Sequence, residues 1–463
     1  EYRLSEKNTG DGAAANQRRS RIKGRIGMSE NKLTRADLFS MAIGQIIGVG
    51  IMTMTGIAIG FTGRSVNIAY VLAGILTIVA AIPQIYIGGT ANFLGGQYSQ
   101  IAVLGNKRLA GVFIYIQIAM ALALSMYTLS FSEYFLSLFP GANAKLVSFV
   151  VLTVLALMHM VGMKQAARLQ NLMCVILAAG IAAYIVFGIG HIQPGYTQSP
   201  GFFTGGASGF VLASIYLTFA AGGATYVVNF SAEAKNPTKD IPFVIIVSTA
   251  AIVILYAVMS TIAAGVLPVE EVAGKPLSVS AVSFMPKAVY TFFVVGGAMF
   301  ALLTTLNFNI GMLVYPLKKA SEDGWLPKGL AATNKRFGTT HWIIAAIYLI
   351  SVLPILAGLD LSTIANSTVI LTTSIRGVIA FVALALPKKL PELWKRSSFY
   401  VSDGKLKVIC IAAMFLAGVS VVMLFVTTSM AQICGNCCIL GVAVVLAFLF
   451  QKKVDVKASY TEK

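Results

Sequence analysis

The chain has 463 residues, of which 57% are hydrophobic and only 11% are charged. In soluble domains about a quarter of the residues are charged, so this composition excludes a soluble globular domain and indicates a protein that crosses a membrane several times. The net charge of +18 would suggest a nucleic acid partner in a soluble protein. We expect no nucleic acid here, because membrane topology accounts for the charge.

Apolar runs of about 20 residues, the length that crosses a bilayer, predict an all-α polytopic membrane protein with twelve transmembrane helices. The runs cover about residues 38–61, 67–91, 109–137, 146–163, 169–190, 209–232, 242–266, 286–315, 341–358, 362–386, 408–428 and 432–451. With the N-terminus in the cytoplasm, 30 of the 35 Lys and Arg residues fall on the inner side. Inner loops are enriched in these residues, so we expect both termini of this multi-pass protein to be cytoplasmic and its location to be the inner or plasma membrane.

The first run contains Gly44-Gln45-Ile46-Ile47-Gly48-Val49-Gly50-Ile51. Because an unpaired backbone group costs several kcal/mol in lipid, a glycine-broken helix persists at membrane depth only where it is buried or lines a cavity. Free N–H groups at such a break would suit a carboxylate. Gly44 and Gly48 also match a helix-packing pair, so this stretch alone leaves both interpretations open.

The sixth run carries a second interruption at a corresponding place, Phe219-Ala220-Ala221-Gly222-Gly223. It opens what looks like a second set of five spans. Paired interruptions in two halves of a chain are the best sequence indication of a transporter's binding site near the middle of the membrane. The pair therefore favours a binding site over simple helix packing.

Four motifs in this chain resemble the amino acid–polyamine–organocation superfamily of permeases, in the same order. They are Ile47-Gly48-Val49-Gly50-Ile51, Gly95-Gly96-Gln97-Tyr98, the pattern Glu-x-x-Asn-Pro-x-x-x-Ile-Pro from Glu233 to Pro242, and Ala320-Ser321-Glu322-Asp323-Gly324-Trp325-Leu326-Pro327. The resemblance covers nearly the whole chain and implies the leucine-transporter (LeuT) fold. Its divisions would be a basic, disordered cytoplasmic tail (1–36), a first inverted repeat (37–190), an extracellular linker (191–208), a second inverted repeat (209–386), a cytoplasmic loop (387–407), two further helices (408–451) and a cytoplasmic tail (452–463).

Carried onto this sequence, the resemblance implies that the N–H groups of Gly48, Val49 and Gly50 bind a substrate carboxylate. The carbonyls of Phe219, Ala220 and Gly222 would bind the ammonium, and the Phe219 ring would be a gate. The expected substrate site also includes Gln45, Ile47 and Ala221. Many permeases carry an aromatic residue at the place of Ala221, so the smaller side chain favours a larger apolar or aromatic substrate.

The coupling mechanism stays open. In sodium-coupled relatives of this fold a cation lies between spans one and eight, and the matching oxygens here belong to Gly44, Ile47, Ala301, Thr304 and Thr305. Threonine hydroxyls in membrane helices also bond their own i−4 carbonyl. Proton-coupled relatives often place a lysine in span five, where this chain has Leu177. Exchange or facilitated transport is the remaining alternative, and besides sodium we expect no metal and no cofactor.

Arg376 lies near the middle of the tenth run. An arginine at this depth costs about 2.5–3.5 kcal/mol on insertion scales and is functional by default. It could act as a gate or select an anionic group. Two structural alternatives are that it caps backbone carbonyls or pairs with Glu233.

We therefore expect a secondary transporter, a symporter or antiporter, that moves amino acids across the plasma membrane by alternating access. The alternatives are an amino acid exchanger, an amine or polyamine permease, and a sensor that binds substrate without transporting it. The chain has three histidines and contains no H-E-x-x-H, G-x-S-x-G or Walker A motif. We therefore expect neither an enzyme nor an ATP-driven pump.

Overall fold

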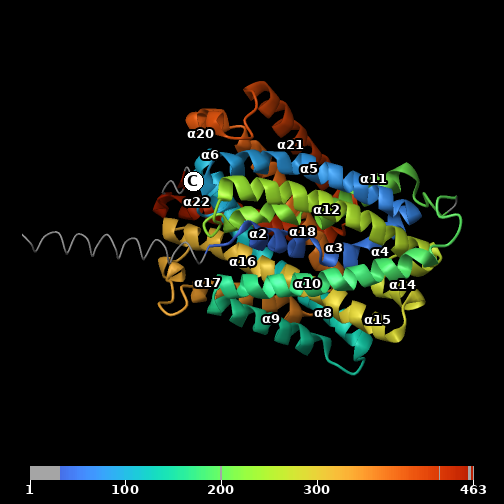
Figure 1. The fold of residues 1–463 in the computed structure, drawn as a ribbon. Helices are drawn as coiled ribbons and strands as arrows, with labels where there is room; N and C mark the ends of the chain where they lie inside the picture. The colour runs from blue at the N-terminus through green and yellow to red at the C-terminus, as the bar shows by residue number, and fades with distance from the viewer. Residues whose placement is uncertain (1–31, 199–200, 427, 457–459, 462–463) are drawn as a thin grey trace, which may run out of the picture.

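The computed structural model describes residues 32–198, 201–426, 428–456 and 460–461. Figure 1 shows long helices lying side by side, with α2 and α18 in the interior and the described C-terminal end at the same end of the bundle as the start of α2. Helix α2 packs against α10, α12, α16 and η4. The first span is thus surrounded by other helices.

The elements of the first part of the chain are α2 (Arg35–Ile46), α3 (Val49–Met52), α4 (Met54–Thr62), η1 (Gly63–Ser65), α5 (Val66–Thr90), β1 (Asn92–Phe93), α6 (Gln97–Leu104), α7 (Lys107–Ala119), η2 (Met120–Ala123), α8 (Leu124–Leu138), α9 (Ala144–Val161), α10 (Met163–Gly188) and η3 (Ile189–His191). The elements of the second part are α11 (Gly206–Ala221), η4 (Gly223–Phe230), α12 (Pro237–Gly265), α13 (Val269–Val272), α14 (Leu277–Phe284), α15 (Lys287–Phe292), the π-helical η5 (Phe293–Met299), α16 (Phe300–Asp323), η6 (Lys328–Ala331), α17 (His341–Ala357), α18 (Leu361–Ala383), α19 (Leu386–Lys389), α20 (Pro391–Arg396), α21 (Asp403–Val426), α22 (Met430–Phe450), η7 (Gln451–Lys453) and β2 (Tyr460–Thr461). The two short strands pair antiparallel, Phe93 opposite Tyr460.

Among the described residues, eleven helical segments are long and apolar enough to cross a membrane. The run expected as the ninth span forms α17, which is apolar but has only 17 residues. The helical, multi-pass architecture is therefore confirmed, whereas the count of twelve spans is not.

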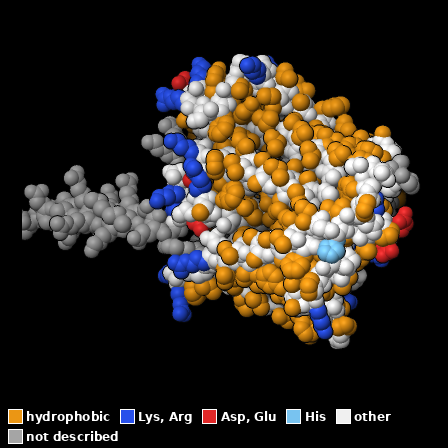
Figure 2. Space-filling view, turned by 45° about the vertical axis from the view of Figure 1, so that its right-hand side comes forward, with side chains coloured by type: hydrophobic (Ala, Val, Ile, Leu, Met, Phe, Trp, Pro, Cys, Tyr) orange, Lys and Arg blue, Asp and Glu red, His pale blue; other side chains and the backbone are white. Residues whose placement is uncertain are grey.

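The surface agrees with this architecture. Figure 2 shows hydrophobic side chains over much of the middle of the visible face, with most of the Lys and Arg side chains at its left end. Many large apolar side chains are exposed, for example Leu172 at 59% and Val175 at 69%. Exposed apolar patches of this size mark a lipid or protein contact, and lipid is the contact expected for helices of this length.

The start of the first span differs from its prediction. Residues 1–31 of the predicted tail lie outside the described part, but Leu33 is buried and bridges to Ala234. Its N–H donates to the Glu233 carbonyl at 2.7 Å. Helix α2 then begins at Arg35, with Thr34 and Asp37 forming a reciprocal capping box. The predicted tail 1–36 therefore ends too late, because Leu33 is held by the segment that follows η4.

An ion pair joins the starts of α2 and α12. Arg35 donates to the Asp240 carboxylate from Nε and Nη2, each at 2.7 Å, and the Asp240 side chain is only 3% exposed. Arg35→Gln would leave this carboxylate without its cation. We expect a stability loss of about 1–3 kcal/mol, below the 3–5 kcal/mol of fully buried pairs because Arg35 is half exposed. Thermal unfolding in detergent measures it, with the exposed neighbour changed as a control, Lys239→Gln. Equal melting temperatures for the two variants would contradict the prediction.

Candidate functional site

The first span is broken where the glycine stretch predicts it. Helix α2 ends at Ile46, and Ile47 is extended with φ −80° and ψ 98° before α3 begins. The freed carbonyls have partners, since Tyr256 donates to the Ile46 oxygen at 2.6 Å and Thr305 donates to the Ile47 oxygen at 3.2 Å. Within the described chain, no protein acceptor takes the N–H groups of Gly48 and Gly50. The break therefore offers hydrogen-bond donors rather than acceptors.

The sixth span is broken at Gly222. Helix α11 ends at Ala221, and the chain continues as the tighter helix η4. The N–H of Gly222 donates to the Phe219 carbonyl at 3.2 Å instead of to Thr218. The last carbonyls of a helix have no partner within it and carry its negative end, so this break offers acceptors.

The two breaks touch each other. A Cβ atom added at Gly50 would lie 2.7 Å from the Ala220 Cβ, and one added at Gly223 would lie 2.7 Å from the Gln45 Cγ. Both separations are too short for carbon atoms. Glycine is required at these positions because the crossing helices leave no room for a side chain.

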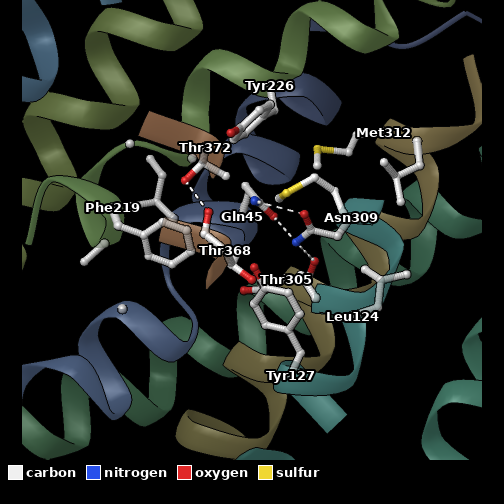
Figure 3. A pocket seen from close by; sticks show the side chains of 18 of the residues that line it. Gln45, Leu124, Tyr127, Phe219, Tyr226, Thr305, Asn309, Met312, Thr368 and Thr372 are labelled. Atoms are coloured by element: carbon white, nitrogen blue, oxygen red, sulfur yellow. Dashed lines mark hydrogen bonds between the residues drawn. The ribbon is translucent and has the colours of Figure 1, made fainter. Parts of the chain in front are cut away.

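A small cavity opens beside this crossing. Figure 3 shows Gln45 and Asn309 facing each other in it, with the rings of Phe219, Tyr127 and Tyr226 around them. The lining residues are Gln45, Ile46, Gly50, Met120, Ala123, Leu124, Tyr127, Phe219, Ala220, Gly222, Gly223, Tyr226, Thr305, Asn309, Met312, Leu313, Thr368, Thr372 and Arg376.

The structure brings seven of the fourteen predicted site residues to this cavity. The predicted residues that line it are Gln45, Gly50, Phe219, Ala220, Gly222, Thr305 and Arg376. Ile47, Gly48 and Ala221 are not among the lining residues, and of Val49 only the backbone is described. Ile47 and Gly48 instead face α16, where a Cβ added at Gly48 would overlap Thr305.

Sequence reasoning missed several cavity residues of α8, α16 and α18, namely Leu124, Tyr127, Asn309, Met312, Leu313, Thr368 and Thr372. Thr368, Thr372 and Arg376 follow one another at intervals of four along α18, so they share one helix face. Thr305, Asn309 and Met312 share a face of α16 in the same way. These stripes within apolar runs were the sequence signal that could have indicated cavity-lining faces. Their spacing does not tell which neighbouring helix each face meets.

Gln45 and Asn309 form a buried amide pair across the cavity. Asn309 Nδ2 donates to Gln45 Oε1 at 2.8 Å and to the Thr305 carbonyl at 2.7 Å, while Gln45 Nε2 donates back to Asn309 Oδ1 at 3.4 Å. Buried polar groups are costly unless they are satisfied. The pair therefore ties α2 to α16 beside the first break.

The five oxygens predicted for sodium lie together. The Thr305 hydroxyl oxygen lies within hydrogen-bond distance of three carbonyls, those of Gly44 at 2.8 Å, Ala301 at 2.9 Å and Ile47 at 3.2 Å, and donates its one proton among them. The Thr304 hydroxyl contacts the Gly44 and Ala301 carbonyls at 3.2 and 2.8 Å. All five atoms are neutral hard oxygens, the ligand type that alkali and alkaline-earth cations prefer. The donor set fits a small cation.

A chain of buried amides packs behind these oxygens. His159 Nε2 lies 2.8 Å from the Asn307 carbonyl, and Asn307 Nδ2 donates to Gln170 Oε1 at 2.8 Å. The Gln170 amide nitrogen lies against Gly44, where an added Cβ would overlap it, and has no acceptor among the described residues. The position beside Gly44 on α10 is therefore held by a neutral amide.

Arg376 lies at the end of α11. Its Nη1 and Nη2 atoms both donate to the Thr218 carbonyl at 3.3 Å. The capping role considered from the sequence is thus present. The alternative partner, Glu233, lies elsewhere, beside Leu33 at the start of the first span. A cation at a helix C-terminus is stabilised by the helix dipole.

The fold and the cavity together define a multi-pass membrane protein with an internal cavity between two broken helices. The profile of the amino acid permease family matches residues 33–448, and the chain belongs to this family. Its members are transporters and not enzymes, so the protein is a transporter of amino acids or related metabolites.

Three relatives illustrate the range of similarity. The chain is 27% identical over 394 residues to the methylthioribose transporter of Bacillus subtilis (strain 168). This alignment covers 80% of the present chain and 83% of the relative. It is 25% identical over 388 residues to a branched-chain amino acid permease of the same organism, covering 79% and 82%. It is also 25% identical over 354 residues to the cystine/glutamate transporter of Homo sapiens, covering 73% and 70%.

Proposed function

We propose that this protein is a secondary transporter that moves amino acids across the plasma membrane by alternating access, with both termini in the cytoplasm. The observation that carries the proposal is the contact between the two helix breaks at one cavity, Gly50 against Ala220. Broken helices that meet near mid-membrane form the substrate sites of transporters built from inverted repeats. The first ten spans form these two repeats of a LeuT-like fold, and the last two spans lie outside them.

The substrate's charged groups bind at the two breaks. The N–H groups of Gly48, Val49 and Gly50 take the carboxylate, and the carbonyls of Phe219, Ala220 and Gly222 take the ammonium. In support of this polarity, the N–H groups of Gly48 and Gly50 have no acceptor within the described chain, and the second break lies at the negative end of α11. A zwitterion matches such a pair. The Phe219 ring lies in the cavity wall and gates it.

The substrate's side chain lies against an apolar wall formed by Met120, Leu124, Met312 and Leu313. Unbranched thioether side chains adapt to ligands of different shape. This wall favours larger apolar or aromatic amino acids. The similarity to a branched-chain amino acid permease supports the same class of substrate.

Sodium is the proposed coupling ion, held by the oxygens of Gly44, Ile47, Ala301, Thr304 and Thr305. These atoms already lie within hydrogen-bond distance of one another across α2 and α16. A bound cation supplies positive charge that ties the first break to α16. Thr305 also lines the cavity, so cation and substrate would stabilise the same arrangement of the first span.

Uptake into proteoliposomes tests the function. Labelled leucine, methionine and phenylalanine are offered with and without an inward sodium gradient, and with and without unlabelled substrate inside. We expect uptake that requires sodium outside and not substrate inside. Uptake that instead requires internal substrate would make the protein an exchanger. Binding without any uptake would make it a sensor, and uptake of amines alone would contradict an amino acid substrate.

A further inference from the structure

Arg376 places a positive charge beside the central cavity without a carboxylate to balance it. The side chain lines this cavity and also a second one, formed with residues such as Leu76 and Leu416. In both linings, as far as the chain is described, no other side chain is charged. The ion pairs of the described chain involve Asp240, Glu322 and Asp323, and none of them includes Arg376.

The hydrogen bonds of Arg376 leave most of its donors unused. A guanidinium has five N–H groups, and the described contacts are two bonds to a single acceptor, the Thr218 carbonyl. A side-chain Cβ at Gly222 would overlap the guanidinium, so the group lies directly against the break in the sixth span. Ionisable groups inside the membrane that face a cavity mark a substrate pathway.

The same helix end serves two cations in the proposed transport function. The carbonyls of Phe219, Ala220 and Gly222 are the proposed acceptors for the substrate ammonium, and Arg376 donates to the neighbouring Thr218 carbonyl. The substrate ammonium and the Arg376 guanidinium would repel each other, and more strongly inside the protein than in water. An acidic group on the substrate would lie between the two cations and relieve the repulsion, and the planar guanidinium can hold a carboxylate with two parallel hydrogen bonds.

We propose that Arg376 selects substrates by the charge of their side chain. It favours a carboxylate over the neutral amide of the same shape, and it rejects a side chain that carries an ammonium group. This inference rests on the proposed amino acid site and adds a substrate class to it: acidic amino acids bind in addition to apolar ones. The capping bond to Thr218 holds the guanidinium at the cavity wall.

Matched substrate pairs test the selection. Glutamate and glutamine differ only in the charge of the end group, and norleucine and lysine differ only by an ammonium. Each is used to compete with labelled uptake in the parent, in Arg376→Gln and in Arg376→Lys. Stabilisation of the detergent-solubilised protein against heat by the same four compounds reports binding without transport. Ser374→Ala serves as a control on α18, since the Ser374 hydroxyl donates to the Ile370 carbonyl of its own helix.

We expect the parent to prefer glutamate over glutamine and norleucine over lysine. Arg376→Gln should reduce the preference for glutamate over glutamine, and that for norleucine over lysine, by about tenfold or more, which is the lower range of coupling between close charges. Arg376→Lys should restore both preferences in part. If Arg376→Gln weakens all four compounds equally, the residue only caps α11 and the inference fails. A parent that binds glutamine at least as well as glutamate also overturns it. Binding with the expected ratios but no uptake would overturn the transport function alone.

Discussion

Gly50→Ala is expected to reduce amino acid uptake by at least about a hundredfold, because a displacement of about 1 Å at a site that positions substrate can have an effect of this size. The added Cβ would lie 2.7 Å from the Ala220 Cβ and 2.8 Å from its Cα. Neither atom belongs to a flexible side-chain end, so the two broken helices must separate. The N–H groups of the first break would then move away from the carbonyls of the second.

The effect is measured as initial uptake into proteoliposomes at equal amounts of inserted protein. Gly60→Ala is the matched control, since Gly60 belongs to the same span but its added Cβ would meet only the Ala273 Cβ at 3.9 Å. Gly60→Ala should transport as the parent does. Unchanged uptake and substrate binding in Gly50→Ala would show that the crossing does not form the substrate site.

Replacing Thr304 and Thr305 together by valine should abolish the sodium dependence of uptake. Valine keeps the branched shape and its stiff rotamer, while two of the five oxygens are lost. Removal of a group that only supports a metal ligand weakens metal binding by about 10–100-fold. Removal of two ligands should therefore weaken sodium binding so far that external sodium no longer stimulates uptake. The readout is uptake as a function of external sodium, with choline as the replacing cation.

Thr368→Val provides the control for this double change. Thr368 lines the same cavity, but its hydroxyl donates to the Ile364 carbonyl of its own helix and lies outside the oxygen cluster. Its variant should keep the sodium dependence of the parent. A parent that transports equally well in choline would dismiss the sodium site, and the hydroxyls of Thr304 and Thr305 would then serve only to hold α2 against α16.

Local chemistry made the two helix breaks predictable. Glycines at membrane depth permit the close approach of the two spans at Gly50 and Gly223 and the departures from helical geometry at Ile47 and Gly222. Both breaks lie where the glycine stretches predict them. The four motifs predicted the family to which the chain belongs. The expected site residues around Gly50 and Phe219 line one cavity, although their role in binding stays a prediction.

Long-range contacts were out of reach of the same reasoning. Leu33 pairs with Ala234 across 201 positions, so the predicted tail ended too late. The partner of Arg376 is the Thr218 carbonyl rather than Glu233, because the backbone at Gly222 turns away and leaves that oxygen without its usual donor. The ninth run forms α17 over almost its predicted length, and Gly358 ends this helix after 17 residues in a left-handed conformation.

The sequence by itself determined the membrane class, the helical segments, the two interruptions and the family, because each depends on composition or on residues close together in the chain. Only the tertiary structure decided which helix faces meet at the cavity. Asn309 and Gln45 share hydrogen bonds across 264 positions, and the polar stripe of α18 meets the end of α11. Helical periodicity tells which side chains share a face, but the packing angles of the neighbouring helices decide what that face touches.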